Sequence, residues 1–114
     1  MPHEGSSSRL TSKFTGLLVE NEAAVQSYVV NVLEKAGNTV VTETNGDRAF
    51  RRYRKEGPFD LVLTDIEHKG MNGVELMRTI RKKHQNQNVR IVTGWPILQK
   101  PFTQKQLLDF IKIR

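Results

Sequence analysis

The sequence predicts an α/β fold in which helices cover a parallel β-sheet. Short apolar runs alternate along the chain with segments whose apolar residues recur at helical spacing. Such short runs are typical of strands that are buried on both faces, as they are in a parallel sheet. We find no internal repeat and no low-complexity segment that would indicate another architecture.

The first half of the chain predicts two strands and the helix between them. Residues 17–19 form an apolar run, and residues 23–36 follow with apolar side chains at the 3.6-residue period of a helix. Gly37 then stands where a left-handed helix cap requires glycine. Residues 39–42 are a second, β-branched run, which we expect to end at the turn pair Asn45-Gly46.

The second half continues the same alternation. Residues 47–55 have the spacing of a helix, which Gly57-Pro58 ends. Residues 59–65 are a third apolar run, and this predicted strand ends on a carboxylate. The remaining predicted elements are a helix, a strand and a last helix that opens with a capping box, at residues 74–83, 89–93 and 104–113.

Length and composition exclude several classes of protein. The chain has 114 residues, enough for one domain with one core, and we expect residues 1–15 to be a flexible N-terminal tail and residues 16–114 to be that domain. The absence of cysteine excludes a disulfide framework and cysteine-ligated metal sites. The chain shows neither a membrane-spanning apolar run nor a secretory signal, so we expect a cytoplasmic protein with no membrane partner.

The positive charge has two explanations. The chain carries 18 basic and 12 acidic residues, a formal net charge of +6 at neutral pH. The basic residues cluster at residues 48–55 and 78–83, on two predicted helices. Such clusters are usually solvated helix surface, so we do not expect nucleic acid to be a partner, although the charge permits it.

Polar residues gather where the predicted strands end. In an open parallel sheet, binding sites form outside the carboxyl ends of the strands, and the carboxylates there need a cation between them. A lysine side chain supplies one positive charge, and Mg²⁺, which prefers oxygen ligands, could supply another. The residues at these strand ends are Glu20, Asn21, Glu22, Asp65, Thr93, Gly94 and, slightly farther along the chain, Lys100.

These strand ends resemble the motifs of the receiver domains of two-component response regulators. The resemblance covers residues 16–114 and implies a flavodoxin-like, doubly wound parallel sheet of the kind found in chemotaxis receivers. The order and spacing of the motifs up to Thr93 are specific to that family. The motifs are the acidic first-strand motif, the phosphoacceptor strand with its loop, and two late signatures, at residues 17–22, 59–65, 70–76, 92–94 and 100–102.

The resemblance assigns a role to each residue at the predicted site. Asp65 would be the phosphoacceptor that forms an aspartyl phosphate. Glu20 and Asn21 would hold Mg²⁺ together with Asp65 and the backbone carbonyl of Glu67. Asn21 stands where the family usually has a second acidic ligand, so we expect Mg²⁺ to bind weakly. For Glu22 we favour a simpler role, that of a carboxylate at a helix N-terminus.

The resemblance also assigns the groups that contact the phosphoryl group. The Thr93 hydroxyl would bond to a phosphoryl oxygen, Lys100 would pair with its charge, and Gly94 would leave access to it. We further expect the Lys100–Pro101 bond to be cis, as the family implies.

The sequence departs from the family between Thr93 and Lys100. In the family this stretch holds a fourth helix and a fifth strand, but here the two residues are only seven positions apart. A parallel crossover needs about a dozen residues, so the fold is predicted to be truncated, with that helix and a regular fifth strand largely missing. We expect the apolar surface left near Trp95 and Ile97 to favour a homo-oligomer or domain exchange.

The sequence therefore predicts a signalling switch. We expect Asp65 to accept a phosphoryl group from a partner histidine kinase or phosphotransfer protein, with no independent enzymatic turnover. The alternative is a degenerate receiver that acts as a phosphorylation-independent interaction or oligomerisation module.

Overall fold

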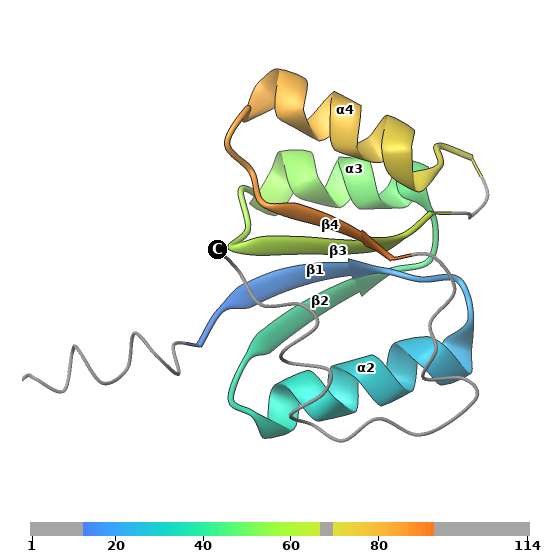
Figure 1. Ribbon diagram of the computed structural model, residues 1–114, viewed down its shortest axis with the longest axis vertical. Helices are drawn as coiled ribbons and strands as arrows, with labels where there is room; N and C mark the ends of the chain where they lie inside the picture. The colour runs from blue at the N-terminus through green and yellow to red at the C-terminus, as the bar shows by residue number, and fades with distance from the viewer. Residues whose placement is uncertain (1–12, 67–69, 93–114) are drawn as a thin grey trace, which may run out of the picture.

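The computed structural model describes residues 13–66 and 70–92. Strands and helices alternate through this part of the chain, as the sequence predicts (Figure 1). The predicted helix at residues 104–113 and the segment between Thr93 and Lys100 lie outside the described residues. The elements are β1 (Thr15–Val19), α2 (Ala23–Lys35), β2 (Thr39–Glu43), α3 (Gly46–Glu56), β3 (Leu61–Asp65), α4 (Gly73–Lys83) and β4 (Val89–Val92).

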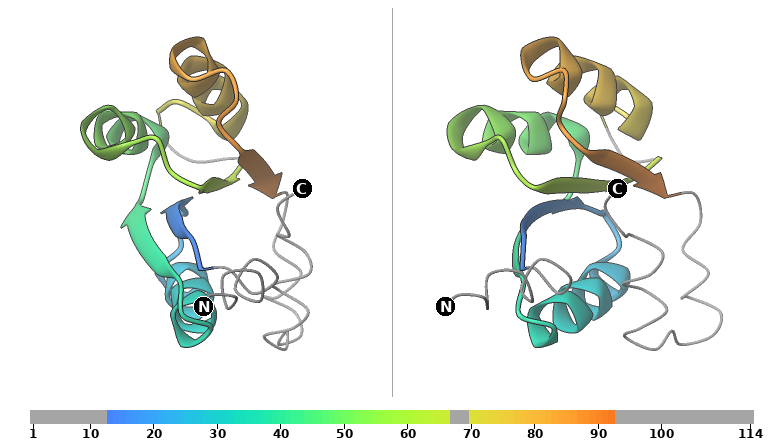
Figure 2. Two further views of the ribbon diagram at one scale, coloured as in Figure 1. Left: turned by 90° about the vertical axis from the view of Figure 1, so that its left-hand side faces the viewer. Right: turned by 60° about the vertical axis from the view of Figure 1, so that its left-hand side comes forward.

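The four described strands form one parallel sheet in the order β2-β1-β3-β4. Helix α2 covers one face of the sheet, whereas α3 and α4 lie side by side on the other (Figure 2). The chain therefore forms a doubly wound α/β sheet, and the predicted fold class is confirmed. In the described part of the chain, no helix has the length and apolar character needed to cross a membrane.

The core is divided by the sheet into two clusters of buried side chains. Successive residues of β1 alternate between them, because side chains along a strand point to opposite faces. Burial of each such side chain contributes about 2 kcal/mol, which holds the central strands in one register. The α2 side contains Leu18, Val25, Val29, Leu33, Leu61, Leu63 and Val92, and the opposite side contains Leu17, Val19, Ala49, Tyr53, Phe59, Val62, Leu76, Ile80 and Val89.

Local signals determine the ends of the helices. Gly37 has a φ of 96°, the left-handed conformation predicted after α2. The second strand ends before Asn45-Gly46, as predicted, and the Asn45 side chain also caps α3 by accepting a hydrogen bond of 2.9 Å from Arg48 N. Helix α4 begins with a capping box in which Asn72 and Glu75 bond to each other's backbone N–H groups.

A buried polar network joins α3, the segment just before β3 and the turn before β4. The Gln87 side chain, 5% exposed, accepts hydrogen bonds from Tyr53 Oη (2.8 Å) and Phe59 N (3.0 Å). Its Nε2 donates in turn to the Phe59 carbonyl oxygen (2.7 Å). The Tyr53 hydroxyl also lies 2.9 Å from Nδ1 of His84. The sequence pattern places Tyr53 in the core but does not reveal this network, since its partners lie more than 25 positions away.

Replacing Gln87 should destabilise the protein. In Gln87→Leu both backbone groups of Phe59 lose their side-chain partner in a buried place, and the Tyr53 hydroxyl keeps only His84, which should cost about 2–3 kcal/mol. Urea unfolding followed by circular dichroism measures the change. Gln85→Leu, at an exposed position two residues away, is the matched control, and equal stabilities of the two variants would contradict the assigned role.

Tyr53 should make stability depend on alkaline pH. Burial raises the pKa of the Tyr53 hydroxyl above its ordinary value of 10.0. The unfolded chain therefore loses this proton at a lower pH than the folded one, and the free energy of unfolding should fall as pH rises above about 10. Urea unfolding between neutral pH and about pH 11 should show a shallower decline in Tyr53→Phe than in the unsubstituted protein.

Candidate functional site

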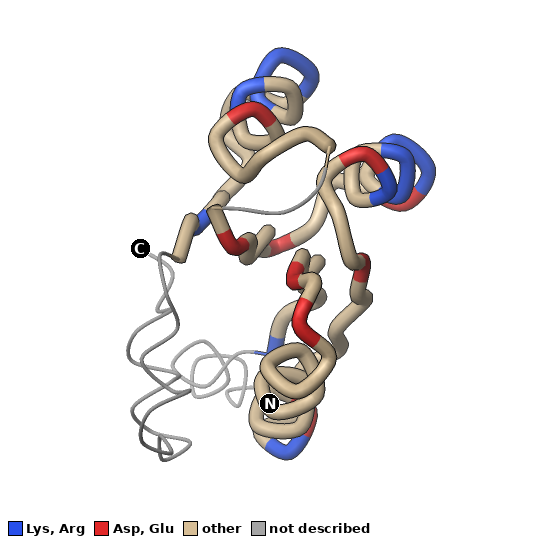
Figure 3. Tube along the Cα trace, turned by 90° about the vertical axis from the view of Figure 1, so that its right-hand side faces the viewer, with Lys and Arg blue, Asp and Glu red and all other residues tan. Residues whose placement is uncertain are grey.

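The register of the sheet brings two of the predicted acidic residues to one level. Val19, the last residue of β1, pairs with Thr64 in β3. The next residues, Glu20 just after β1 and Asp65 at the end of β3, therefore lie at the same level. Asp65 in turn pairs with Val92, the residue before Thr93. Figure 3 looks onto this edge and shows acidic positions gathered at the centre, with basic positions on the outer sides of α3 and α4. The edge is therefore an acidic centre between basic helices.

Glu20 is a buried carboxylate immediately after β1. It is 2% exposed, and its Oε2 accepts a hydrogen bond of 2.8 Å from Glu22 N. Its own N–H donates to the Glu43 carbonyl oxygen at 3.0 Å, which continues the pairing with β2 past the end of the strand. Asn21 and Glu22 are exposed, and Glu22 is the N-cap residue of α2, although its side chain makes no capping hydrogen bond. The buried acidic group of this turn is thus Glu20.

Gln26 is a supporting residue that the sequence analysis missed. Its Nε2 donates to the carbonyl oxygens of Glu20 (3.1 Å) and Glu43 (3.4 Å), which end β1 and β2. This amide joins α2 to both strand ends and holds the backbone that carries Glu20. A single glutamine in a predicted helix is too weak a signal to reveal these contacts from the sequence.

Asp65 is half-buried at the end of β3. Its Oδ1 accepts a hydrogen bond of 2.8 Å from Ile66 N, and its backbone carbonyl accepts one of 2.8 Å from the Thr64 hydroxyl. The bond from Ile66 N therefore orients the Asp65 carboxylate, and the bond from Thr64 holds the backbone beneath it.

Glycines allow the segment after Asp65 to pack closely. A Cβ atom on Gly73 would lie 2.5 Å from the Asp65 carbonyl oxygen, while Gly73 N donates to the Ile66 carbonyl at 2.9 Å. A Cβ on Gly46 would collide with the backbone of Met71, and Gly70, with a φ of 73°, leaves no room for one beside the Asp47 carboxylate. The start of α3 and both ends of the segment between β3 and α4 are thus held together by backbone contact.

The structure places part of the predicted site. Glu20, Asn21 and Asp65 meet at one edge, whereas Glu67, Thr93, Gly94 and Lys100 lie outside the described residues. Within residues 13–66 and 70–92, no three Asp, Glu or His side chains are grouped as a metal site would group them. Two carboxylates and an amide oxygen nevertheless fit Mg²⁺, which keeps several of its waters when it binds to proteins.

Comparisons with known proteins identify the family. The sequence model described as "Response regulator receiver domain" matches residues 17–97. The response regulator receiver protein CpdR of Brucella abortus is 32% identical over 111 residues, which cover 84% of this chain and 92% of that protein. The chain therefore belongs to the response regulator receiver family, whose members are signalling modules, and the predicted membership is confirmed.

Solved structures agree with the fold. Chemotaxis response regulator CheY4 of Vibrio cholerae superposes with a TM-score of 0.74 at 20% identity, covering 89% of this chain and 98% of that one. Response regulator TrrA of Thermotoga maritima, solved in complex with Mg²⁺ and BeF, has a TM-score of 0.63 at 30% identity, over 71% of this chain and 70% of that one.

The contact between Gly73 and Asp65 predicts whether a substitution at Gly73 stabilises or destabilises the protein. Alanine is the better helix former by about 1 kcal/mol, so without the contact Gly73→Ala should stabilise α4. Because the new Cβ would meet the Asp65 backbone at 2.5 Å, we expect destabilisation by about 1–3 kcal/mol instead. Urea unfolding measures it, with Gly16→Ala as control, where the Cβ would lie 3.2 Å from the Phe14 ring and 3.4 Å from the Leu61 carbonyl oxygen. A stabilised Gly73→Ala variant would show that the backbone yields easily.

Proposed function

We propose that this protein is the phosphoacceptor switch of a two-component phosphorelay, phosphorylated on Asp65 by a partner histidine kinase or phosphotransfer protein. The observation that carries the proposal is the position of Asp65, which ends a central strand of a receiver fold level with the buried Glu20. Membership of the receiver family supports it.

In the proposed reaction, the phosphoryl group moves from a phosphohistidine to the Asp65 carboxylate. Ile66 N–H holds Oδ1 at 2.8 Å, and Oδ2 attacks the phosphorus atom. An O–P bond forms, the P–N bond breaks, and the imidazole of the donor keeps the electron pair and takes up a proton. Such transfer depends mainly on positioning and electrostatics, which the hydrogen bonds at Glu20 and Asp65 supply in part.

Charge neutralisation completes the proposed site. Glu20, Asn21, Asp65 and the Glu67 carbonyl would hold Mg²⁺, bound weakly because Asn21 brings no charge. When bound, the ion would neutralise charge on the phosphoryl oxygens. TrrA, whose structure contains Mg²⁺ and BeF, supports this assignment. We further propose that Thr93 and Lys100 contact the phosphoryl group and that Gly94 leaves room for it.

Intact-mass spectrometry tests the assignment of Asp65. With acetyl phosphate and Mg²⁺, the protein should gain about 80 Da, the mass of one phosphoryl group, and chelation of Mg²⁺ by EDTA should prevent the gain. Asp65→Asn should show no adduct. Asp60→Asn is the matched control, since Asp60 lies just before the opposite end of the same strand, bonded to Thr15 N at 2.8 Å. An adduct that persists in Asp65→Asn, or the lack of any adduct in the unsubstituted protein, would overturn the proposal.

A further inference from the structure

One side of α3 carries a row of basic side chains over a hollow in the surface. Arg48, Arg51, Arg52 and Lys55 recur at intervals of three, four and seven residues, which places them on the same side of a helix. Together with Glu43 of β2 and Glu56 they line an open hollow of about 440 Å³. We call this feature the α3 hollow. From the sequence alone, these cations are predicted to be ordinary solvated helix surface.

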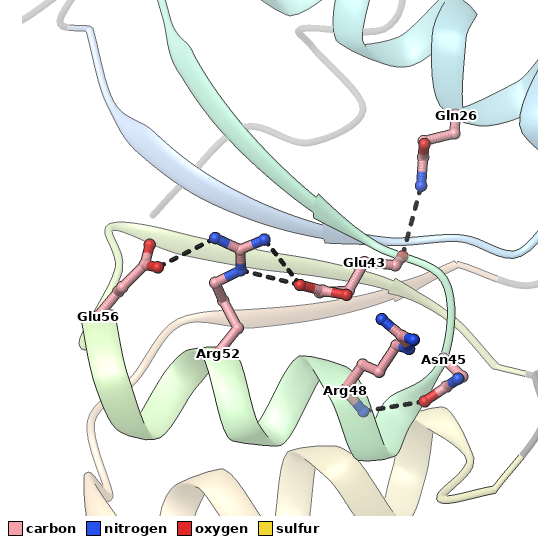
Figure 4. A network of polar contacts seen from close by, with 6 residues as sticks. All are labelled: Gln26, Glu43, Asn45, Arg48, Arg52 and Glu56. Carbon is pink, nitrogen blue, oxygen red and sulfur yellow. Dashed lines mark hydrogen bonds and ion pairs between the residues drawn. The ribbon is translucent and has the colours of Figure 1, made fainter.

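Arg52 ties the two carboxylates of the hollow together. Its Nη2 lies 2.8 Å and its Nε 2.9 Å from Glu43 Oε2, and its Nη1 lies 3.0 Å from Glu56 Oε2 (Figure 4). The hydrogen bonds to Glu56 and Glu43 raise the pKa of the guanidinium. Both carboxylates that line the hollow are therefore already paired, and the guanidinium links the helix to the end of the edge strand.

The other three cations are available to a partner. Arg48, Arg51 and Lys55 are exposed, and none of them forms an ion pair with any residue that the structure describes. Four cations against two carboxylates leave the lining with a net charge of +2. In Figure 4 the Arg48 side chain rises on the same side of α3 as Arg52, toward the end of β2. The α3 hollow thus presents positive charge over about 10 Å, the length of two helical turns.

The lining favours isolated carboxylates over a chain of phosphates. A nucleic acid backbone repeats its negative charge continuously and could not avoid Glu43 and Glu56, and the hollow is lined by no aromatic side chain on which bases could stack. A protein segment can place single carboxylates opposite Arg48, Arg51 and Lys55 only, and guanidinium groups match carboxylates with two parallel hydrogen bonds. We propose that the α3 hollow is a docking surface for an acidic segment of a protein partner.

The row runs from the candidate site toward the other end of the sheet. Asn45 caps α3 beside the carboxyl ends of the strands, Arg48 lies in the first turn and Lys55 in the last. A partner in the α3 hollow would therefore reach the edge that carries Asp65. The docking itself needs no phosphoryl group on Asp65, so it stands apart from the proposed phosphorelay.

Binding of a labelled acidic peptide tests the proposal. Fluorescence anisotropy at low ionic strength with a labelled peptide of about ten residues, in which glutamates are separated by uncharged residues, should give a Kd that rises at least about tenfold in the triple variant R48Q/R51Q/K55Q. The matched control is R78Q/K82Q/K83Q, which removes the same number of exposed charges from α4 and should change Kd less than about threefold. Asp65→Asn should bind the peptide as tightly as the unsubstituted protein, which separates this result from the phosphorylation test.

Two outcomes would overturn the proposal. An equal loss of affinity in both triple variants would mean that the peptide responds to net charge and not to the α3 hollow. Tighter binding to duplex DNA or to vesicles containing phosphatidylserine than to the peptide, lost in R48Q/R51Q/K55Q, would assign the surface to another class of partner. Far-ultraviolet circular dichroism should show unchanged folding of both triple variants, because all six side chains are exposed.

Discussion

The pairing of β1 with β3 is the constraint on which the rest of this structure depends. Both strands are buried on both faces, so a shift by one residue would move every side chain of a strand into the wrong half of the core. The register that packing selects also sets Glu20 beside Asp65 where the strands end. Hydrophobic packing between the layers thereby determines the distance between two polar groups at the edge, and the candidate site needs no separate scaffold.

Backbone contacts join that edge to the helices that surround it. Gln26 connects α2 to the ends of β1 and β2, and the glycines at residues 46, 70 and 73 let the segment after β3 lie directly against its neighbours. Short contacts therefore tie the edge that carries Asp65 to α2, α3 and α4. Groups packed this closely have little room for small changes of position. This property suits a family of signalling domains.

Charge is segregated on this molecule. Acidic residues gather at the carboxyl edge of the sheet, while basic residues predominate on the outer sides of α3 and α4, where only a few acidic residues stand among them. Net charge alone conceals this division, since a formal charge of +6 permits many kinds of partner. The arrangement separates the acidic edge, where we propose that a cation and a phosphoryl group bind, from the α3 hollow, where we propose that an acidic segment docks.

The alternation of strands and helices, the left-handed cap at Gly37 and the acidic strand ends can all be predicted from the sequence, because these features depend on near neighbours and on periodicity. The same holds for Asn45-Gly46, where the second strand gives way to the predicted helix, although that helix begins at Gly46, one residue earlier than predicted. Three features depend on how the elements pack: the burial of Glu20, the bridges that Gln26 and Gln87 make between distant segments, and the ion pair of Arg52 with Glu43 in the α3 hollow. These contacts join residues that have no periodic relation, so they become visible only when packing sets the distances between elements.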